Sequence, residues 1–310
     1  MRIRIIAFTL PIAVFILIMP TVNLCFGMGS LHEPDGKGLY FYSWREVNSF
    51  LKEMNYSSYE TNHWLDIRRN ATGTELLIIK MLKSNGKALV VSCNGSIKEI
   101  DIPSNNVWLN EEYQALAWLD WKEKNVVVRY RNGQAEKLSN FRVDKRADPS
   151  GLYFMKSKMT IARDEYDSTL IYSIDAPLEP LVEIRDFFGQ RIFSKGNKVY
   201  LFGNYYGDRD KQYDFYVFER KGTTLTQQDK VIIRRPREAP TSFFVRDFSP
   251  WDDDVLITDS RDFGRSDLYL YNIHTKELKK IGKEPFGSGC GFFLQCNIIQ
   301  KVVNEQKKKN

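Results

Sequence analysis

Side chains suited to metal binding or nucleophilic catalysis are scarce in this chain. Its 310 residues include 4 cysteines and 3 histidines. Neither a Cys-x-x-Cys pair nor a haem-attachment motif occurs, which argues against thioredoxin-like chemistry and covalent haem. His32, His63 and His274 lie far apart without metal-ligand spacing. A Gly-x-Ser-x-Gly elbow and a phosphate-binding glycine loop are also missing, so the sequence favours a protein that is not an enzyme, without deciding the question.

Long helical periodicity and a strong charge of one sign are absent too. The 45 lysines and arginines exceed the 39 acidic residues by 6, and Arg2, Arg4 and the lysines at 307–309 supply much of this excess at the two ends. A mildly basic body does not indicate nucleic-acid binding. Aromatic residues make up 14 % of the chain and hydrophobic residues 43 %, a composition typical of a folded protein rich in β-structure.

The first residues have the order of an export signal. Arg2 and Arg4 precede an apolar stretch over residues 5–24, which predicts a signal peptide at 1–27, a mature start near Met28 and a periplasmic or extracellular location. Two alternatives stay open. About 20 apolar residues also suffice for an uncleaved membrane anchor, and Cys25 could carry a lipid. Membrane contact is expected only through such an anchor.

The remaining chain reads as one repeat domain, a β-propeller over residues 28–303. Short β-type runs recur in pairs, such as those around the Asn94-Gly95 and Asn132-Gly133 turns, and Asn-Gly suits a two-residue hairpin. The pairs begin roughly 40 residues apart, the length of a propeller blade. We therefore predict an all-β propeller with six blades, five or seven remaining open, and a β-sandwich as the rival fold.

One segment carries a resemblance to a known family. Residues 248–272, Phe-Ser-Pro-Trp-Asp-Asp-Asp-Val-Leu-Ile-Thr-Asp-Ser-Arg-Asp-Phe-Gly-Arg-Ser-Asp-Leu-Tyr-Leu-Tyr-Asn, resemble the repeat of TolB-like, WD-type propellers. The segment departs from that repeat at Trp251-Asp252 and at Asp262-Phe263-Gly264. The resemblance implies placement in the periplasm or outside the cell and a protein-binding or scaffold role.

The two ends of the body suggest how the ring closes. Within an N-terminal segment at 30–69, residues 44–54 have one apolar helical face, which predicts a short helix packed on the propeller. Residues 291–299 read as a last strand that pairs with N-terminal residues and removes a free sheet edge. The basic tail at 304–310 is expected to be disordered. Cys93, Cys290 and Cys296 remain after the signal, an odd number.

Candidate sites are few. The predicted function is an exported protein-binding or scaffold module whose partner docks on aromatic side chains of loops, namely Tyr205, Tyr206, Trp251 and Phe263. The alternative is a five-bladed glycoside hydrolase, which would draw on dispersed carboxylates such as Asp35, Asp148, Glu165 or Asp186. We expect no cofactor. Calcium stays open at two aspartate clusters, although turn aspartates more often bond their own turn: Asp208, Asp210 and Asp214, and Asp252, Asp253, Asp254, Asp259 and Asp262.

Overall fold

The structure is a computed structural model that describes most of the chain from residue 38 onward. The described ranges are 38–56, 65–80, 86–104, 106–120, 122–123, 125–129, 133–138, 141–143, 148, 153–160, 165–173, 179–205, 212–234, 243–259, 266–283 and 288–309. The predicted signal peptide lies outside them. Within these ranges, no helix has the length and apolar character needed to cross a membrane.

Five antiparallel sheets of four strands each follow one another along the chain, and we name them blades 1 to 5. Blade 1 contains β2 (Leu65–Arg69), β3 (Glu75–Lys80), β4 (Gly86–Ser92) and β5 (Ile97–Ile102). Blade 2 contains β6 (Val107–Leu109), β7 (Ala115–Asp120), β8 (Asn125–Arg129) and β9 (Ala135–Leu138). Blade 3 contains β10 (Phe141–Val143), β11 (Tyr153–Thr160), β12 (Glu165–Ser173) and β13 (Val182–Arg185). Blade 4 contains β14 (Phe187–Lys195), β15 (Lys198–Tyr205), β16 (Gln212–Lys221) and β17 (Thr224–Arg234). Blade 5 contains β18 (Phe243–Phe248), β19 (Asp254–Asp259), β20 (Asp267–Asn272) and β21 (Leu278–Lys283).

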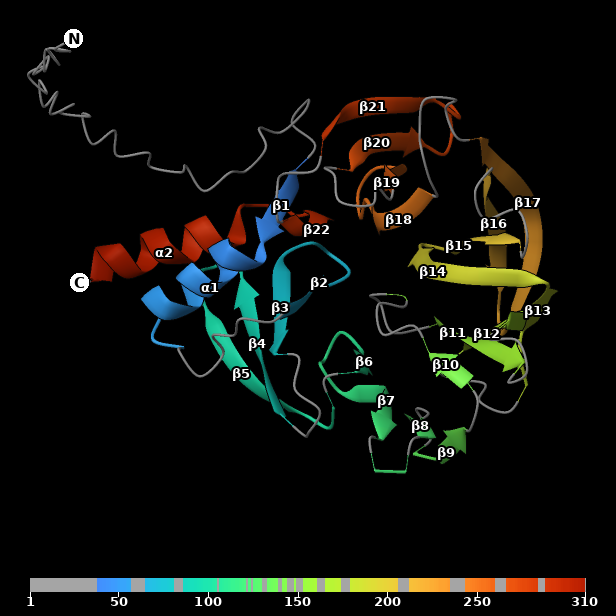
Figure 1. The fold of residues 1–310 in the computed structure, drawn as a ribbon, viewed down its shortest axis with the longest axis horizontal. Coiled ribbons are helices and arrows are strands. Elements are labelled where there is room, and N and C mark those ends of the chain that lie inside the picture. Colours follow the sequence, from blue (N-terminus) through green and yellow to red (C-terminus); the bar gives the residue numbers. More distant parts are fainter. Residues whose placement is uncertain are drawn as a thin grey trace, which may run out of the picture.

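The blades stand around a centre as a propeller does. In Figure 1 the first strands β2, β6, β14 and β18 lie towards the middle, and the fourth strands β5, β9, β17 and β21 lie towards the outside. The paired runs recognised in the sequence are strands of these sheets: Val255 of β19 pairs with Tyr271 of β20, and Met155 of β11 pairs with Ile171 of β12. The β-propeller expectation is confirmed.

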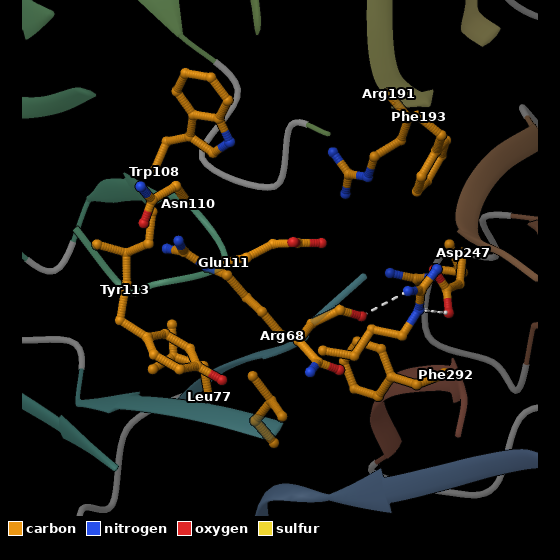
Figure 2. Close-up of a pocket in the computed structure, with 15 residues that line it drawn as sticks. Arg68, Leu77, Trp108, Asn110, Glu111, Tyr113, Arg191, Phe193, Asp247 and Phe292 are labelled. Atoms are coloured by element: carbon orange, nitrogen blue, oxygen red, sulfur yellow. Dashed lines mark hydrogen bonds and ion pairs between the residues drawn. The ribbon is translucent and has the colours of Figure 1, made fainter. Parts of the chain in front are cut away.

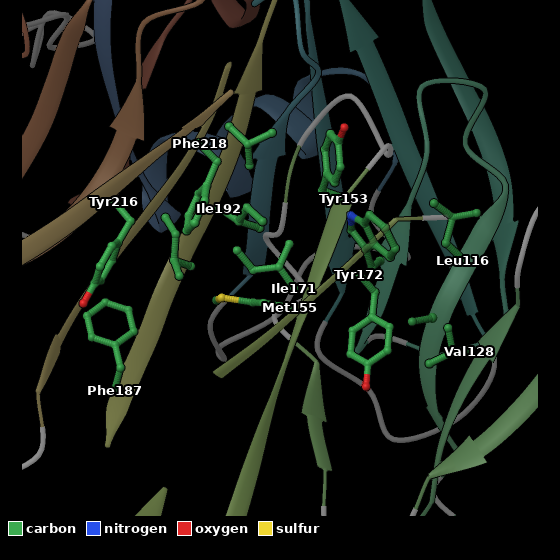
Figure 3. Close-up of a cluster of buried hydrophobic side chains, with 14 of the residues drawn as sticks. Leu116, Val128, Tyr153, Met155, Ile171, Tyr172, Phe187, Ile192, Tyr216 and Phe218 are labelled. Carbon is green, nitrogen blue, oxygen red and sulfur yellow. The ribbon is translucent and has the colours of Figure 1, made fainter. Parts of the chain in front are cut away.

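Apolar side chains fill the spaces between successive blades. The largest cluster runs through blades 2, 3 and 4 and includes Val128, Ile171 and Phe218 (Figure 3). Separate clusters join blade 1 to blade 2 and blade 4 to blade 5. Two more clusters pack blade 5 and blade 1 against the segments at the two ends of the described chain. Burial of these faces gives the ring a continuous core.

The sixth place in the ring is filled by the two ends of the chain. Here β1 (Leu39–Ser43) pairs antiparallel with β22 (Ser288–Phe293), as predicted for a strand that closes the ring. This sheet has two strands, so the prediction of six blades is corrected to five complete blades and one shorter closing sheet. The difference arises because helices, rather than further strands, continue the chain on either side of it.

The first of these helices is α1 (Trp44–Glu53), which confirms the predicted N-terminal helix. Ser43 caps it by accepting a hydrogen bond from the backbone N–H of Glu46, whose side chain accepts from the Ser43 N–H in return. This capping box satisfies amide groups that a helix start leaves unpaired. Val47, Phe50 and Leu51 are fully buried against blade 1 and the C-terminal helix, so the helix packs on the propeller as expected.

The second helix, α2 (Ile298–Lys309), was not predicted. Residues 304–309 continue it, so the expectation of a disordered tail is wrong, as is that of strand at 298–299. Asn297 caps the helix by accepting from the N–H of Gln300 at 3.2 Å. Four aliphatic side chains of the helix lie on one face and are at most 2 % exposed, namely Ile298, Ile299, Val302 and Val303. Their burial holds the helix on the ring.

Candidate functional site

The first strands of the blades surround a pocket of about 80 Å³ near the middle of the ring (Figure 2). Its lining comes from β2, β3, β6, β14, β18, β22 and the turn after β6. Strands of blades 1, 2, 4 and 5 and the closing sheet therefore all contribute. Four of the lining residues are arginines, Arg68, Arg69, Arg191 and Arg246, against two acids, Glu111 and Asp247.

Arg68 and Arg69 join blade 1 to blades 2 and 5. Arg68 is paired with Asp66 at 2.8 Å and donates through Nη1 to the carbonyl oxygen of Val107 in blade 2. Arg69 is paired with Asp247 of blade 5 at 2.7 Å. Both guanidinium groups are largely buried, and buried charges persist where partners satisfy them. These two arginines hold the ring together at the pocket wall.

Arg191 and Arg246 each make a hydrogen bond within their own blade. Arg191 Nη1 donates to the carbonyl oxygen of Gln190 at 2.8 Å, and Arg246 Nε donates to Thr258 Oγ1 at 3.0 Å. Each guanidinium is a rigid fork of five donors that matches a carboxylate or phosphate. Two arginines from separate blades thus bring positive charge to one pocket.

Aromatic and aliphatic side chains form the remaining walls. Trp108, Phe193 and Phe292 are each less than 10 % exposed and come from blade 2, blade 4 and the closing sheet. The indole nitrogen of Trp108 donates to the carbonyl oxygen of Asp148 at 3.4 Å, which fixes the ring. Ligand pockets typically combine such apolar walls with a few polar groups.

A strained turn supports one side of the pocket. Tyr113 has φ 62°, a left-handed conformation that is unusual for a bulky residue. Its hydroxyl donates to Glu75 Oε2, and Glu75 Oε1 accepts from Ser92 Oγ at 2.7 Å. Burial, followed by the hydrogen bond and charge of Glu75, raises the pKa of Tyr113 well above its ordinary value. This network keeps the hydroxyl protonated and fixes the turn that carries Glu111.

Glu111 lies at the rim of the pocket and is exposed. In Figure 2 its side chain and that of Arg191 extend towards the middle of the pocket from different walls. Desolvation raises the pKa of Glu111, and the nearby carboxylates of Glu112 and Asp148 raise it further. A carboxyl group with a raised pKa beside a pocket is a candidate for ligand contact.

A second cavity of about 220 Å³ adjoins the pocket and shares Arg69 and Phe193 with it. Lys195, Phe248 and Pro250 also line it. The ammonium group of Lys195 lies 3.2 Å from Asp253 and 5.5 Å from the centre of the Phe248 ring. The second cavity is therefore partly aromatic, with one cation at its wall.

Of the four carboxylates named for glycoside hydrolysis, the structure describes the side chains of Asp148 and Asp186. Asp148 is fully buried and accepts hydrogen bonds from the N–H and hydroxyl of Ser194 and from the N–H of Tyr153. It joins the chain before β11 to β14 and thus has a structural role. Asp186 is exposed between β13 and β14. Asp35 lies outside the described residues, and the side chain of Glu165 is not among those described.

Of the four aromatic residues predicted to anchor a partner, the structure describes the side chain of Trp251. Tyr206 and Phe263 lie outside the described residues, and Tyr205 is the last residue of β15. Trp251 is 39 % exposed. Its indole covers the backbone at Gly38 and Gly73, where an added Cβ would come within 3.1 Å of the ring. Within the described part of the chain, the predicted docking surface is therefore represented by the exposed part of Trp251.

The aspartates considered for calcium take part in local contacts. Asp214 pairs with Lys230 at 3.1 Å, Asp254 accepts from Asn272 at 2.8 Å, and Asp259 accepts from the N–H of Asp267. Across the part of the chain that the structure describes, no group of three or more potential ligand side chains gathers for a metal ion. Asp208, Asp210 and Asp262 lie outside that part, so calcium stays an open prediction.

The sequence interpretation missed the pocket arginines. It identified the third and fourth strands of blades 1 and 2 and the second and third strands of blades 3 to 5, whereas the arginines lie on first strands. The available signal was a basic residue next to a β-branched one, as in Ile67-Arg68, Arg191-Ile192 and Val245-Arg246. Such dipeptides indicate a shared site only when it is known that their strands meet at the middle of the ring.

Comparisons with known proteins concern the fold. No protein-family model and no curated protein matches the chain. Among solved structures, an acylaminoacyl peptidase from Pyrococcus horikoshii has a TM-score of 0.39 at 14 % identity, over 70 % of this chain and 39 % of that one. The β-propeller domain of the Trilobed protease from Pyrococcus furiosus gives 0.33 at 10 % identity, over 72 % and 57 %. An uncharacterized protein from Listeria monocytogenes gives 0.40 at 12 %, over 71 % and 70 %. The chain thus spans about two fifths to three fifths of the two peptidases.

These comparisons contradict the function interpreted from the sequence. Peptidases, among them acylaminoacyl peptidase and oligopeptidase B, stand among the similar structures where a scaffold protein or a glycoside hydrolase was expected. The likeness is one of fold at low identity, so peptidase chemistry is not carried over to this chain.

Proposed function

We propose that the chain binds a small anionic ligand in the pocket at the middle of the ring. The observation that carries the proposal is the convergence of Arg191 and Arg246, from blades 4 and 5, on a pocket with aromatic walls. Arg68 and Arg69 have partners in Asp66 and Asp247. Arg191 and Arg246 both line the pocket and bring to it the positive charge with which a carboxylate would pair.

The size of the site favours an acid with a compact apolar body. The arginine pocket measures about 80 Å³ and the adjoining cavity about 220 Å³. A cavity of roughly 150 Å³ can hold a benzene ring, so a phenyl group fits the second space beside Phe193 and Phe248. The carboxylate would then lie in the first space, where bidentate hydrogen bonds to arginine give orientation as well as affinity.

We also propose that the mature protein works in the periplasm or outside the cell and is related to TolB-like propellers. The disulfide between Cys93 and Cys296 supports the location, because such bonds persist in oxidising compartments and are rare in the cytosol. The repeat at 248–272 supports the relationship through its sequence alone. A ligand-binding protein in these compartments would take its ligand from the surroundings of the cell.

Isothermal titration calorimetry of the full chain with 3-phenylpropanoate tests the binding proposal. Arg191→Gln and Arg246→Gln each replace a charged guanidinium by a shorter, neutral amide that can still form hydrogen bonds. A hydrogen bond to a charged group contributes about 1.5–3 kcal/mol, so we expect each substitution to weaken binding at least about tenfold. Inorganic phosphate, titrated in parallel, reports whether the arginines prefer the smaller anion.

Arg220→Gln is the matched control, because Arg220 is exposed in the hairpin between β16 and β17 and remote from the pocket lining. It carries the same charge change and should bind as the wild type does. Thermal melts establish that all three variants remain folded. Binding that is equal in wild type and Arg191→Gln, or absent for both anions in the wild type, would show that the pocket is not an anion site.

A further inference from the structure

Glu111 places a negative charge in the pocket in addition to the positive charges of the arginines. It lines the same space as Arg191 and Arg246 but comes from blade 2, on the turn after β6. Figure 2 shows Glu111 and Arg191 extending towards the middle from different walls. An acid at the rim of an otherwise cationic pocket would repel a ligand that is only an anion. A ligand that also carries a positive group would be attracted both to the arginines and to Glu111.

We infer that the ligand is an amino acid, with its carboxylate on Arg191 and Arg246 and its ammonium group on Glu111. The inference rests on the proposed function and adds the chemical class of the ligand. An ammonium group offers three donors to a carboxylate that accepts. The aromatic walls, together with the adjoining cavity beside Phe193 and Phe248, favour an amino acid with an apolar side chain.

The turn that carries Glu111 is built for a fixed position. Tyr113 holds a left-handed backbone conformation two residues later, and its hydroxyl bonds to Glu75 of blade 1. Asn110 accepts from the N–H of Gln114 at 2.8 Å across the same turn. Residues held in rarely populated backbone regions cluster at ligand sites. The strained turn therefore fixes the backbone position from which the Glu111 side chain extends.

The charge of Glu111 predicts opposite pH dependences for two related ligands. Burial and the neighbouring acids Glu112 and Asp148 raise the pKa of Glu111. As pH rises through that pKa, Glu111 becomes negative, so an ammonium group binds better and a simple carboxylate binds worse. L-phenylalanine and 3-phenylpropanoate differ only by the amino group and report these two cases.

The experiment is calorimetric titration of the full chain with both ligands at several values between about pH 5 and 7. We expect the affinity for L-phenylalanine to rise with pH and that for 3-phenylpropanoate to fall. Glu111→Gln should remove both slopes and weaken L-phenylalanine about tenfold, while 3-phenylpropanoate binds at least as well as before. Glu112→Gln is the matched control on the same turn and should keep the preference for L-phenylalanine.

The outcomes separate this inference from the proposed function. Binding of 3-phenylpropanoate with no gain from the amino group would overturn the inference and leave the anion site standing. Equal loss of both ligands in Glu111→Gln would also overturn it, because it would mark Glu111 as structural. If neither ligand binds the wild type, the proposed function and the inference both fail.

Discussion

The ring is held together differently at its closing sheet and between its complete blades. Between blades 4 and 5 aromatic rings pack together: the centre of the Phe248 ring lies 5.7 Å from that of Phe193 and 4.9 Å from that of Tyr200. At the closing sheet, apolar packing is joined by specific polar and covalent bonds. Asp247 accepts there from Arg69 and from the N–H of Phe293 at 2.9 Å, and a disulfide joins Cys93 to Cys296.

The difference follows from chain connectivity. Blades 4 and 5 are consecutive, so a short connection already holds them near each other. The strands of the closing sheet come from opposite ends of the chain, and bringing distant segments together costs more conformational entropy. The residues of the disulfide are 203 positions apart. The disulfide and the bonds of Asp247 therefore offset an entropic cost that the junctions between consecutive blades do not have.

The largest effect is expected from breaking the buried ion pair of the closing sheet. Asp247→Ala leaves the Arg69 guanidinium buried without its carboxylate, and removing one partner of a buried pair typically costs about 3–5 kcal/mol. Urea unfolding of the variant measures the loss in free energy of unfolding. Glu123→Gln, which breaks an exposed pair with Lys137 on blade 2, is the control and should leave the unfolding midpoint in place. Equal, small effects of both substitutions would show that the buried pair stabilises the ring no more than an exposed pair does.

The disulfide should have the next largest effect. Replacing Cys93 and Cys296 together by alanine frees a long loop in the unfolded state, and removal of such a bond typically costs about 2–4 kcal/mol. Unfolding with and without reductant measures the contribution. The double variant should show no further response to reductant, whereas the wild type should weaken to the level of the variant. A wild type that is insensitive to complete reduction would show that packing alone closes the ring.

An aromatic substitution examines the junction between complete blades. Phe248 is 2 % exposed and packs between blades 4 and 5, and Phe248→Leu should cost about 1–2 kcal/mol through lost packing. Phe244→Leu on the same strand is the control, because Phe244 is 37 % exposed, and its effect should be smaller. If both substitutions were neutral, the junction between blades 4 and 5 would depend on contacts other than Phe248.

The smallest effect concerns the polar pair between blades 4 and 5. Burial alone would raise the pKa of Asp253, but the hydrogen bond and charge of Lys195, followed by the charge of His274, lower it below its ordinary value. A lowered pKa means that the folded state prefers the ionised form, so this stability is present above the ordinary pKa and is lost as pH falls. The pair is partly exposed and contributes less than about 1 kcal/mol. Asp253→Asn should therefore be slightly less stable than the wild type at neutral pH, with the difference vanishing in acid.

Asp252→Asn is the control for that measurement, since the Asp252 side chain is exposed beside the pair and Lys195 bonds only its carbonyl oxygen. Stability curves from pH 7 down into acid should overlay for this variant and the wild type. A difference between Asp253→Asn and the wild type that grows as pH falls would have the wrong sign for this account.

The regular parts of the fold could be predicted because their signals are local. Asn94-Gly95 marks the hairpin of β4 and β5, and the apolar face with Val47 and Phe50 marks α1. The helix α2 was missed although Ile298 and Val302 have helical spacing, because its lysine-rich end resembles a polar tail. The partner of Cys296 could not be derived, since the pairing depends on the ring bringing distant residues together.

The candidate site could not be predicted for the same physical reason. Arg191 and Arg246 are 55 positions apart, on strands with no alternation strong enough to stand out. Their shared role exists only where inner strands of separate blades meet. By contrast, Asp148 was singled out as a carboxylate, and its burial with Ser194 gives it a structural role.

A crystal structure of the full chain grown with 3-phenylpropanoate tests the central claim most directly. The account predicts the ligand at the middle of the ring, with its carboxylate within hydrogen-bond distance of Arg191 and Arg246 and its phenyl ring beside Phe193. A ligand bound elsewhere on the surface, with these two arginines turned to protein partners and the pocket closed, would contradict it.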